Sequence, residues 1–189
     1  MISIFDIASH LSKTCRYAGA CPNFYSVAEH SMVGAMLIPE PDKLAFLLHD
    51  AHEAYLGDLT RLLQAAVYRL IRDEEGIKSD FDPIKELKKR IDLLISDKYD
   101  VNLAHQIQFF HTYSSNKVVK DFDNAMLQVE AESFGFQVED WELPPTSAKI
   151  DKKRFEEILD REGFALPVVN HGRIADQFIN MFYDLGGEE

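Results

Sequence analysis

Apolar residues recur at three- and four-residue steps along most of the chain, which is the spacing of a helix with one buried face. The first segment shows this with Ile4, Ile7 and Leu11 on one side of a helix. The same pattern predicts helices over residues 4–11, 26–37, 41–55, from 60 onward, 82–95, from 114 or 115 to 129, 151–161 and 171–185. No run of strands alternates with these helices, as a parallel sheet would require, so the fold class predicted is all-α.

Local signals support the ends of these segments. Gly57 is typical of a helix stop, and residues 135–147, with two prolines, break the helical pattern and indicate a loop or one short strand. The expected start signals are Pro41 in a first turn, Thr60 as a cap, Asp82–Pro83, and Ser114 or Ser115 as a cap. We therefore expect one domain over residues 1–189, with a core of about 4–134 and a C-terminal helical extension of about 151–185.

Composition narrows the classes of partner. The chain carries 32 acidic against 20 basic side chains and a formal net charge of −12, so it lacks the basic surface with which proteins bind polymeric nucleic acid. A small anionic substrate remains compatible, because a local group of cations can override the overall charge. Two cysteines, no signal-peptide pattern and no membrane-spanning run indicate a cytoplasmic protein that contacts no membrane.

The segment LLHDAHEAYLGDL, residues 47–59, concentrates ionisable groups on an apolar, helix-periodic stretch. His49 and Asp50 are adjacent, and Glu53 follows one helical turn later on the side of Asp50. Asp58 comes directly after the predicted helix stop. Because a buried helix rarely carries so many ionisable groups without a use for them, this segment is the first candidate for a functional site.

Two further segments carry candidate ligands. His30 lies among apolar neighbours in YSVAEHS, and Asp123 lies in VVKDFDNAM, where Asp121 is a rival. Taken alone, His30 could be an ordinary helix histidine and Asp123 a surface carboxylate. Together with His49 and Asp50 they make a mixed nitrogen and oxygen set that suits Mn, Fe, Co, Zn or Mg. Such a site can lower the pKa of a bound water toward about 7.

The order H…HD…D resembles the HD-domain superfamily of phosphohydrolases. More closely, the sequence is similar to bacterial and phage 5′-deoxynucleotidases and phage dATP triphosphohydrolases, in which a segment like CRYAGACPNFYSVAEHS precedes HDAHEAYLGDL. The resemblance covers residues 4–62 well and 114–132 less closely. It implies a single divalent ion held by His30, His49, Asp50 and Asp123, and leaves room for an additional divalent ion bound to the substrate.

The resemblance also implies roles for residues around the ion. Glu53 would position or deprotonate the attacking water, and Asp58 would be its acidic partner on the leaving side. Arg16 would bind a phosphate through both arms of its guanidinium. Tyr17 would pack against sugar or base, a plain core aromatic being the alternative. Lys120 would lie near the phosphate, a solvated helix lysine being the alternative.

His52 has no clear counterpart in these families, so we expect a mononuclear site with His52 at its rim. The remaining histidines show no ligand spacing: His10, His105, His111 and His171. The implied function is cleavage of the 5′-phosphate ester of a dNMP, or of a dNTP such as dATP with release of triphosphate. A phosphodiesterase of cyclic or linear nucleotides and a non-catalytic nucleotide-binding module are the alternatives. We expect a homo-oligomer with a small nucleotide as its substrate.

Overall fold

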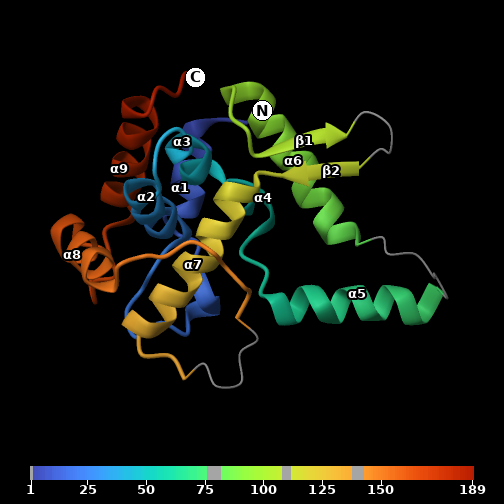
Figure 1. Ribbon diagram of the computed structural model, residues 1–189, viewed down its shortest axis with the longest axis horizontal. Helices are drawn as coiled ribbons and strands as arrows, with labels where there is room; N and C mark the ends of the chain where they lie inside the picture. The colour runs from blue at the N-terminus through green and yellow to red at the C-terminus, as the bar shows by residue number, and fades with distance from the viewer. Residues whose placement is uncertain (1, 76–81, 108–111, 138–142) are drawn as a thin grey trace.

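The structure, a computed structural model, describes residues 2–75, 82–107, 112–137 and 143–189 (Figure 1). Its elements are α1 Ile4–Leu11, the 3₁₀ turn η1 Arg16–Gly19, α2 Val27–Leu37, α3 Lys43–Leu48, α4 Glu53–Leu56, α5 Arg61–Glu75, α6 Pro83–Tyr99, β1 Ala104–Ile107, β2 Thr112–Ser115, α7 Lys117–Ser133, α8 Lys152–Glu162 and α9 His171–Asp184. The predicted all-α class is confirmed. The two short strands form one antiparallel pair that the sequence analysis did not predict.

Helix α2 is the centre of the hydrophobic core. Every residue from Val27 to Ala35 is buried, and α2 contacts α1, α3, α7, α8 and α9 (Figure 1). A helix that is buried on all sides is stable only when other elements surround it. Its start is fixed by a capping box, in which the Ser26 hydroxyl accepts from the Glu29 amide at 3.1 Å and the Glu29 carboxylate accepts from the Ser26 amide at 2.7 Å.

The prediction of one continuous helix over residues 41–55 is wrong. The structure breaks it into α3 and α4, and Pro41 precedes the first helix instead of lying in its first turn. Between the two helices the amides of Ala51 and Glu53 bond to the carbonyls of Leu48 and Asp50, three residues back, at 3.0 and 2.9 Å. This is the tighter 3₁₀ pattern, in which side chains three residues apart lie one above the other.

The start of α7 also differs from the prediction. Ser114 and Ser115 belong to β2, and the cap is Asn116, whose side-chain oxygen accepts from the amides of Val118 and Val119 at 3.0 and 3.2 Å. The predicted break over 135–147 is irregular wherever it is described, and residues 138–142 lie outside the described part. Gly57, with a φ of 78°, ends α4 as expected.

Helix α5 extends away from the helices around α2, and the element that it mainly contacts is α6 (Figure 1). Its apolar side chains are consequently open to solvent, with Leu62 84% exposed and Leu70 59% exposed. None of the helices in the described ranges combines the length and the apolar character needed to cross a membrane.

Candidate metal centre

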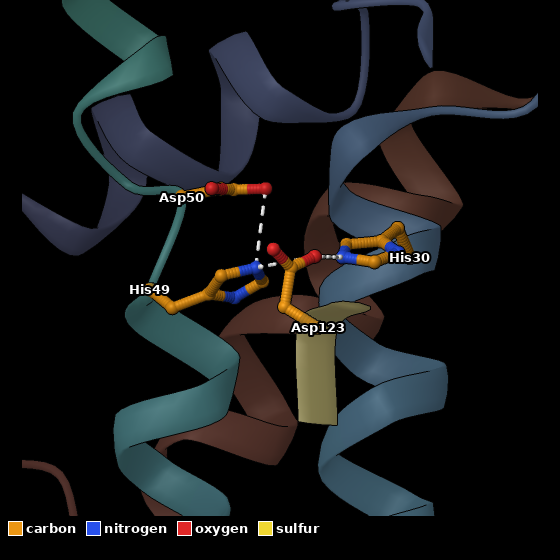
Figure 2. Close-up of side chains that lie close together, drawn as sticks. All are labelled: His30, His49, Asp50 and Asp123. Atoms are coloured by element: carbon orange, nitrogen blue, oxygen red, sulfur yellow. Dashed lines mark ion pairs between the residues drawn. The ribbon is translucent and has the colours of Figure 1, made fainter. Parts of the chain in front are cut away.

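Three separate parts of the fold bring four side chains together (Figure 2). His30 comes from the middle of α2, His49 and Asp50 from the turn after α3, and Asp123 from α7. One ligand atom from each of the four lies within 4.8 Å of the others, and His30 is fully buried. The structure thus gathers the four residues that the sequence analysis chose as ligands.

The distances between these four side chains match the spacing of ligands around a cation better than the length of direct hydrogen bonds. Nε2 of His49 lies 3.2 Å from Asp50 and 3.6 Å from Asp123, and Nε2 of His30 lies 3.4 Å from Asp123. Two ligands about 2.1 Å from one ion at a tetrahedral angle are about 3.4 Å apart. Neither Nε2 atom has a hydrogen-bond partner, although both are buried. Buried nitrogens of this kind require a ligand, and the donor set suits a divalent transition metal.

The other nitrogen of each histidine is already bound. Nδ1 of His49 donates to the carbonyl of Phe46 at 2.7 Å, and Nδ1 of His30 donates to the Glu130 carboxylate at 2.6 Å. A proton held on Nδ1 leaves the lone pair on Nε2, which is the tautomer that binds a metal. Both imidazoles are therefore oriented for coordination by contacts outside the ligand group.

The ligand group is rich in negative charge. Although burial lowers the pKa of His49, the carboxylates of Asp50 and Asp123 raise it to about 10. Burial acts against the charged form of Asp123 as well, yet the two histidines and Lys120 lower the pKa of this carboxyl. Two half-buried carboxylates thus favour a positive charge at the point where the four side chains meet, and a divalent cation would supply one.

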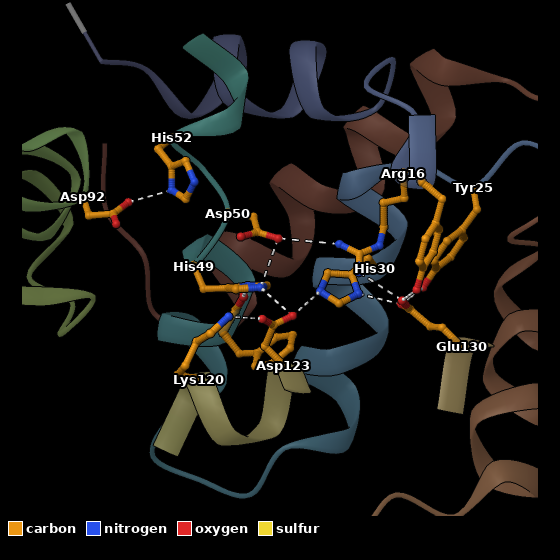
Figure 3. A network of polar contacts seen from close by, with 12 residues as sticks. Arg16, Tyr25, His30, His49, Asp50, His52, Asp92, Lys120, Asp123 and Glu130 are labelled. Atoms are coloured by element: carbon orange, nitrogen blue, oxygen red, sulfur yellow. Dashed lines mark hydrogen bonds and ion pairs between the residues drawn. The ribbon is translucent and has the colours of Figure 1, made fainter. Parts of the chain in front are cut away.

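Glu130 is one of the residues that the sequence analysis missed. It is fully buried, and its carboxylate accepts from the hydroxyl groups of Tyr17 at 2.6 Å and Tyr25 at 3.0 Å and from Arg16 at 3.0 Å (Figure 3). Burial raises its pKa, but Arg16 and then His30 outweigh burial and bring the pKa to about 2. Its position seven residues after Asp123 was the available signal, because this spacing returns to the same helical face.

Arg16 joins this buried carboxylate to the four candidate ligands. Its guanidinium contacts Glu130 and lies 3.7 Å from Asp50, while Nε has no hydrogen-bond partner. Tyr17 follows with a positive φ of 56°, and its ring lies 4.9 Å from that of Phe136. The hydroxyl and the ring of Tyr17 thus both have partners within the protein, but Tyr17 is only half-buried and lies outside the hydrophobic core, so both of its expected roles stay predictions.

Glu53 and Asp58 are the two acidic groups expected beside the ions. Glu53 is only 7% exposed, and its Oε2 atom has no hydrogen-bond partner. Burial, and after it the neighbouring charges of Asp50 and Asp58, raise the pKa of Glu53 to about 9. Asp58 is half-buried, and burial raises its pKa too. Both carboxyls therefore hold protons more strongly than carboxyls in water do.

A cavity of about 140 Å³ opens beside the ligand group, between the 49–52 turn, α6 and the start of α7. Its walls include His49, Asp50 and Asp123 together with His52, Asp92 and Lys120. Lys120 is exposed, and its ammonium lies 2.7 Å from Asp123. His52, expected at the rim of the site, is 7% exposed and lines this cavity. Asp92 was not a candidate in the sequence, since it lies on a helix with many exposed charges.

The contacts of Asp121 and Asp123 show which of the two is the candidate ligand. Asp121 accepts hydrogen bonds from the amides of Ser147 and Ala148 at 2.9 and 3.0 Å and from the Ser147 hydroxyl at 2.7 Å. It therefore anchors the segment that leads into α8, whereas Asp123 faces the two histidines.

Comparison with known proteins adds little beyond this geometry. No family model matches the sequence. A curated relative, the protein named "Uncharacterized protein YfdR" from Escherichia coli (strain K12), is 38% identical over 98 residues, which are 52% of this chain and 47% of that protein. The chain thus spans about half the length of this relative, whose name states no activity.

Proposed function

We propose that the chain is a metal-dependent phosphohydrolase of the HD-domain type that acts on deoxynucleotides. The observation that carries the proposal is the convergence of His30, His49, Asp50 and Asp123, with two buried Nε2 atoms that have no hydrogen-bond partner. A divalent ion held by these residues would polarise a phosphoryl oxygen and make water a better nucleophile.

The neighbouring carboxyls supply the proton transfers. Glu53 accepts a proton from the attacking water, whose oxygen forms a bond to phosphorus as the bond from phosphorus to the 5′-oxygen breaks. Asp58 donates a proton to the leaving 5′-oxygen, so that a deoxynucleoside is released. A cation at the neighbouring ligands favours the charged form of Glu53, which can then act as the base.

Two cations of the protein stand close enough to serve an anionic substrate. Arg16 lies beside Asp50, and Lys120 lies on the wall of the cavity. The positive charge of these two side chains offsets, at this place, the net negative charge of the chain, as binding of a phosphate requires. The substrate is a dNMP, which gives phosphate, or a dNTP such as dATP, which gives triphosphate.

A panel of substrates tests the proposal. The purified chain is incubated with each dNMP, each dNTP and cyclic nucleotides in Mn²⁺ or Co²⁺, and released phosphate and triphosphate are separated by chromatography. We expect one class to be cleaved, His49→Ala to be inactive, and Glu53→Gln to keep the ion held by the four ligands but lose most turnover. Val168→Ala, at a position that is 85% exposed, is the control and should stay active.

Two other results would contradict the proposal. Cleavage of cyclic nucleotides alone would favour a phosphodiesterase, and tight nucleotide binding with no turnover would favour a non-catalytic module. The expected homo-oligomer stays a prediction, which light scattering can check on the same sample.

A further inference from the structure

A second group of ligand atoms lies directly beside the first. Asp50, His52 and Glu53 each offer one atom, and these atoms lie within 4.8 Å of one another. Asp50 belongs to both groups. The 3₁₀ character of the 49–52 turn explains the arrangement, because side chains three residues apart lie one above the other and Glu53 therefore follows the direction of Asp50.

His52 is oriented from another helix. Asp92 of α6 lies 2.9 Å from Nδ1 of His52, so this nitrogen carries the proton and Nε2 keeps its lone pair (Figure 3). Nε2 is buried and has no hydrogen-bond partner. A carboxylate behind a histidine whose other nitrogen is free is the arrangement that commonly supports a metal ligand.

Glu53 provides a second and independent sign of a missing ligand. Its Oε2 atom is buried without a hydrogen-bond partner, although the side chain is only 7% exposed. His52 and Glu53, both more than nine-tenths buried, thus each carry an acceptor without a partner, and each offers a ligand atom within 4.8 Å of one on Asp50. Buried polar groups are almost always satisfied, and a cation would satisfy both acceptors at once.

We propose that Asp50, His52 and Glu53 form a second divalent-cation site, in which Asp50 bridges to the first site and Asp92 positions His52. One imidazole and two carboxylates suit Mn, Fe, Co or Zn. This inference deepens the proposed function, since paired cations can neutralise both the attacking and the leaving oxygen of a phosphate ester. It does not depend on turnover, because binding of the metal alone tests it.

The experiment counts Mn²⁺ ions bound per full-length chain by equilibrium dialysis with elemental analysis, and records their electron paramagnetic resonance. We expect two ions in the wild type, with the spectrum of a coupled pair, and one ion in His52→Asn. Asp92→Asn should bind the second ion about 10- to 100-fold more weakly, because it removes only the group that orients His52. Val168→Asn, at a position that is 85% exposed, should still bind two ions.

The outcomes separate this site from the first one. One ion in both the wild type and His52→Asn, lost in His49→Asn, would overturn the second site and leave the proposed function standing. No bound ion in the wild type would overturn both. Circular dichroism shows whether His52→Asn is folded; if it is not, Asp92→Asn decides, and an unchanged second affinity in that variant overturns the site.

Discussion

Nδ1 of His30 lies 2.6 Å from the carboxylate of Glu130, a residue 100 positions further along the chain. The contact joins the centre of α2 to α7, the helix that also supplies Asp123. Helix α7 therefore provides both a candidate ligand, Asp123, and the carboxylate that orients a second candidate ligand, His30. The orientation of His30 thus depends on how α7 packs against α2.

The first prediction concerns this contact. Glu130→Gln keeps the volume of the side chain but removes the charge that faces Arg16 and His30. We expect an affinity for Mn²⁺ about 10- to 100-fold lower in calorimetric titration. We also expect a loss of about 3 kcal/mol in the free energy of unfolding, because the buried arginine loses its main partner. Glu132→Gln, on an exposed side of the same helix, should change neither. Wild-type affinity in Glu130→Gln would contradict this role.

The second prediction concerns the packing of α2 on α3. A Cβ atom at Gly34 would overlap the ring of Phe46, which also packs against the His49 ring at 4.4 Å between centroids. We expect Gly34→Ala to lower the free energy of unfolding in urea by about 1–3 kcal/mol. Gly172→Ala in α9, where the added carbon meets one oxygen at 3.4 Å, should be neutral or slightly stabilising. Equal stability of the two variants would show that Phe46 can move away.

The third prediction concerns Lys120, whose ammonium competes with a cation for Asp123. Lys120→Met should therefore bind Mn²⁺ several-fold more tightly in the absence of substrate. If the proposed function holds, the same variant should show a raised KM, because a phosphate loses a nearby positive charge. Lys117→Met, exposed one turn earlier, is the control. A weaker affinity for Mn²⁺ in Lys120→Met would refute the competition.

The fourth prediction concerns acid stability away from the metal centre. Burial opposes the charge on Glu189, but hydrogen bonds from Lys98, the Ile4 amide and Tyr99 together outweigh burial and lower its pKa below the usual 4.5. A lowered pKa means that Glu189 stabilises the fold above about pH 4.5 and that this contribution disappears as the pH falls through the lowered value.

Thermal melts check this sign. Between pH 7 and about pH 3, Glu189→Gln should lose less stability than the wild type, by at most about 1 kcal/mol since the contact is near the surface. Glu188→Gln, at the exposed neighbouring position, should behave like the wild type. Identical acid sensitivity of all three proteins would show that the contacts of Glu189 contribute nothing to stability.

Much of the fold and of the ligand group could be predicted from the sequence. The helical period located α1, α2, α8 and α9 closely, because each buries one side or all of its surface in a common core. The break after His49 could not be predicted, since neither glycine nor proline marks it and the apolar period continues through it. The pairing of β1 with β2 is set by contacts between two short polar segments, which carry little local signal.

The hydrogen-bond partners of the candidate ligands could not be predicted from the sequence for a different reason. Asp92 and Glu130 lie on helices rich in charged residues, where a carboxylate ordinarily faces solvent. Only the packing of α6 and α7 against the turn and α2 shows that these two carboxylates face histidines. A sequence readily indicates which residues can bind a metal. It indicates less readily which other residues orient those ligands.

Because His30 precedes and Asp123 follows the stretch that contains α5 and the β1–β2 pair, an ion held by both would act as a cross-link closing a long loop of the chain. Closing such a loop removes conformations from the unfolded ensemble, and binding to the folded form alone adds stability by mass action. A chelator should accordingly lower the melting temperature of the whole domain. The concentration of free metal would then set the lifetime of the folded protein as well as its activity.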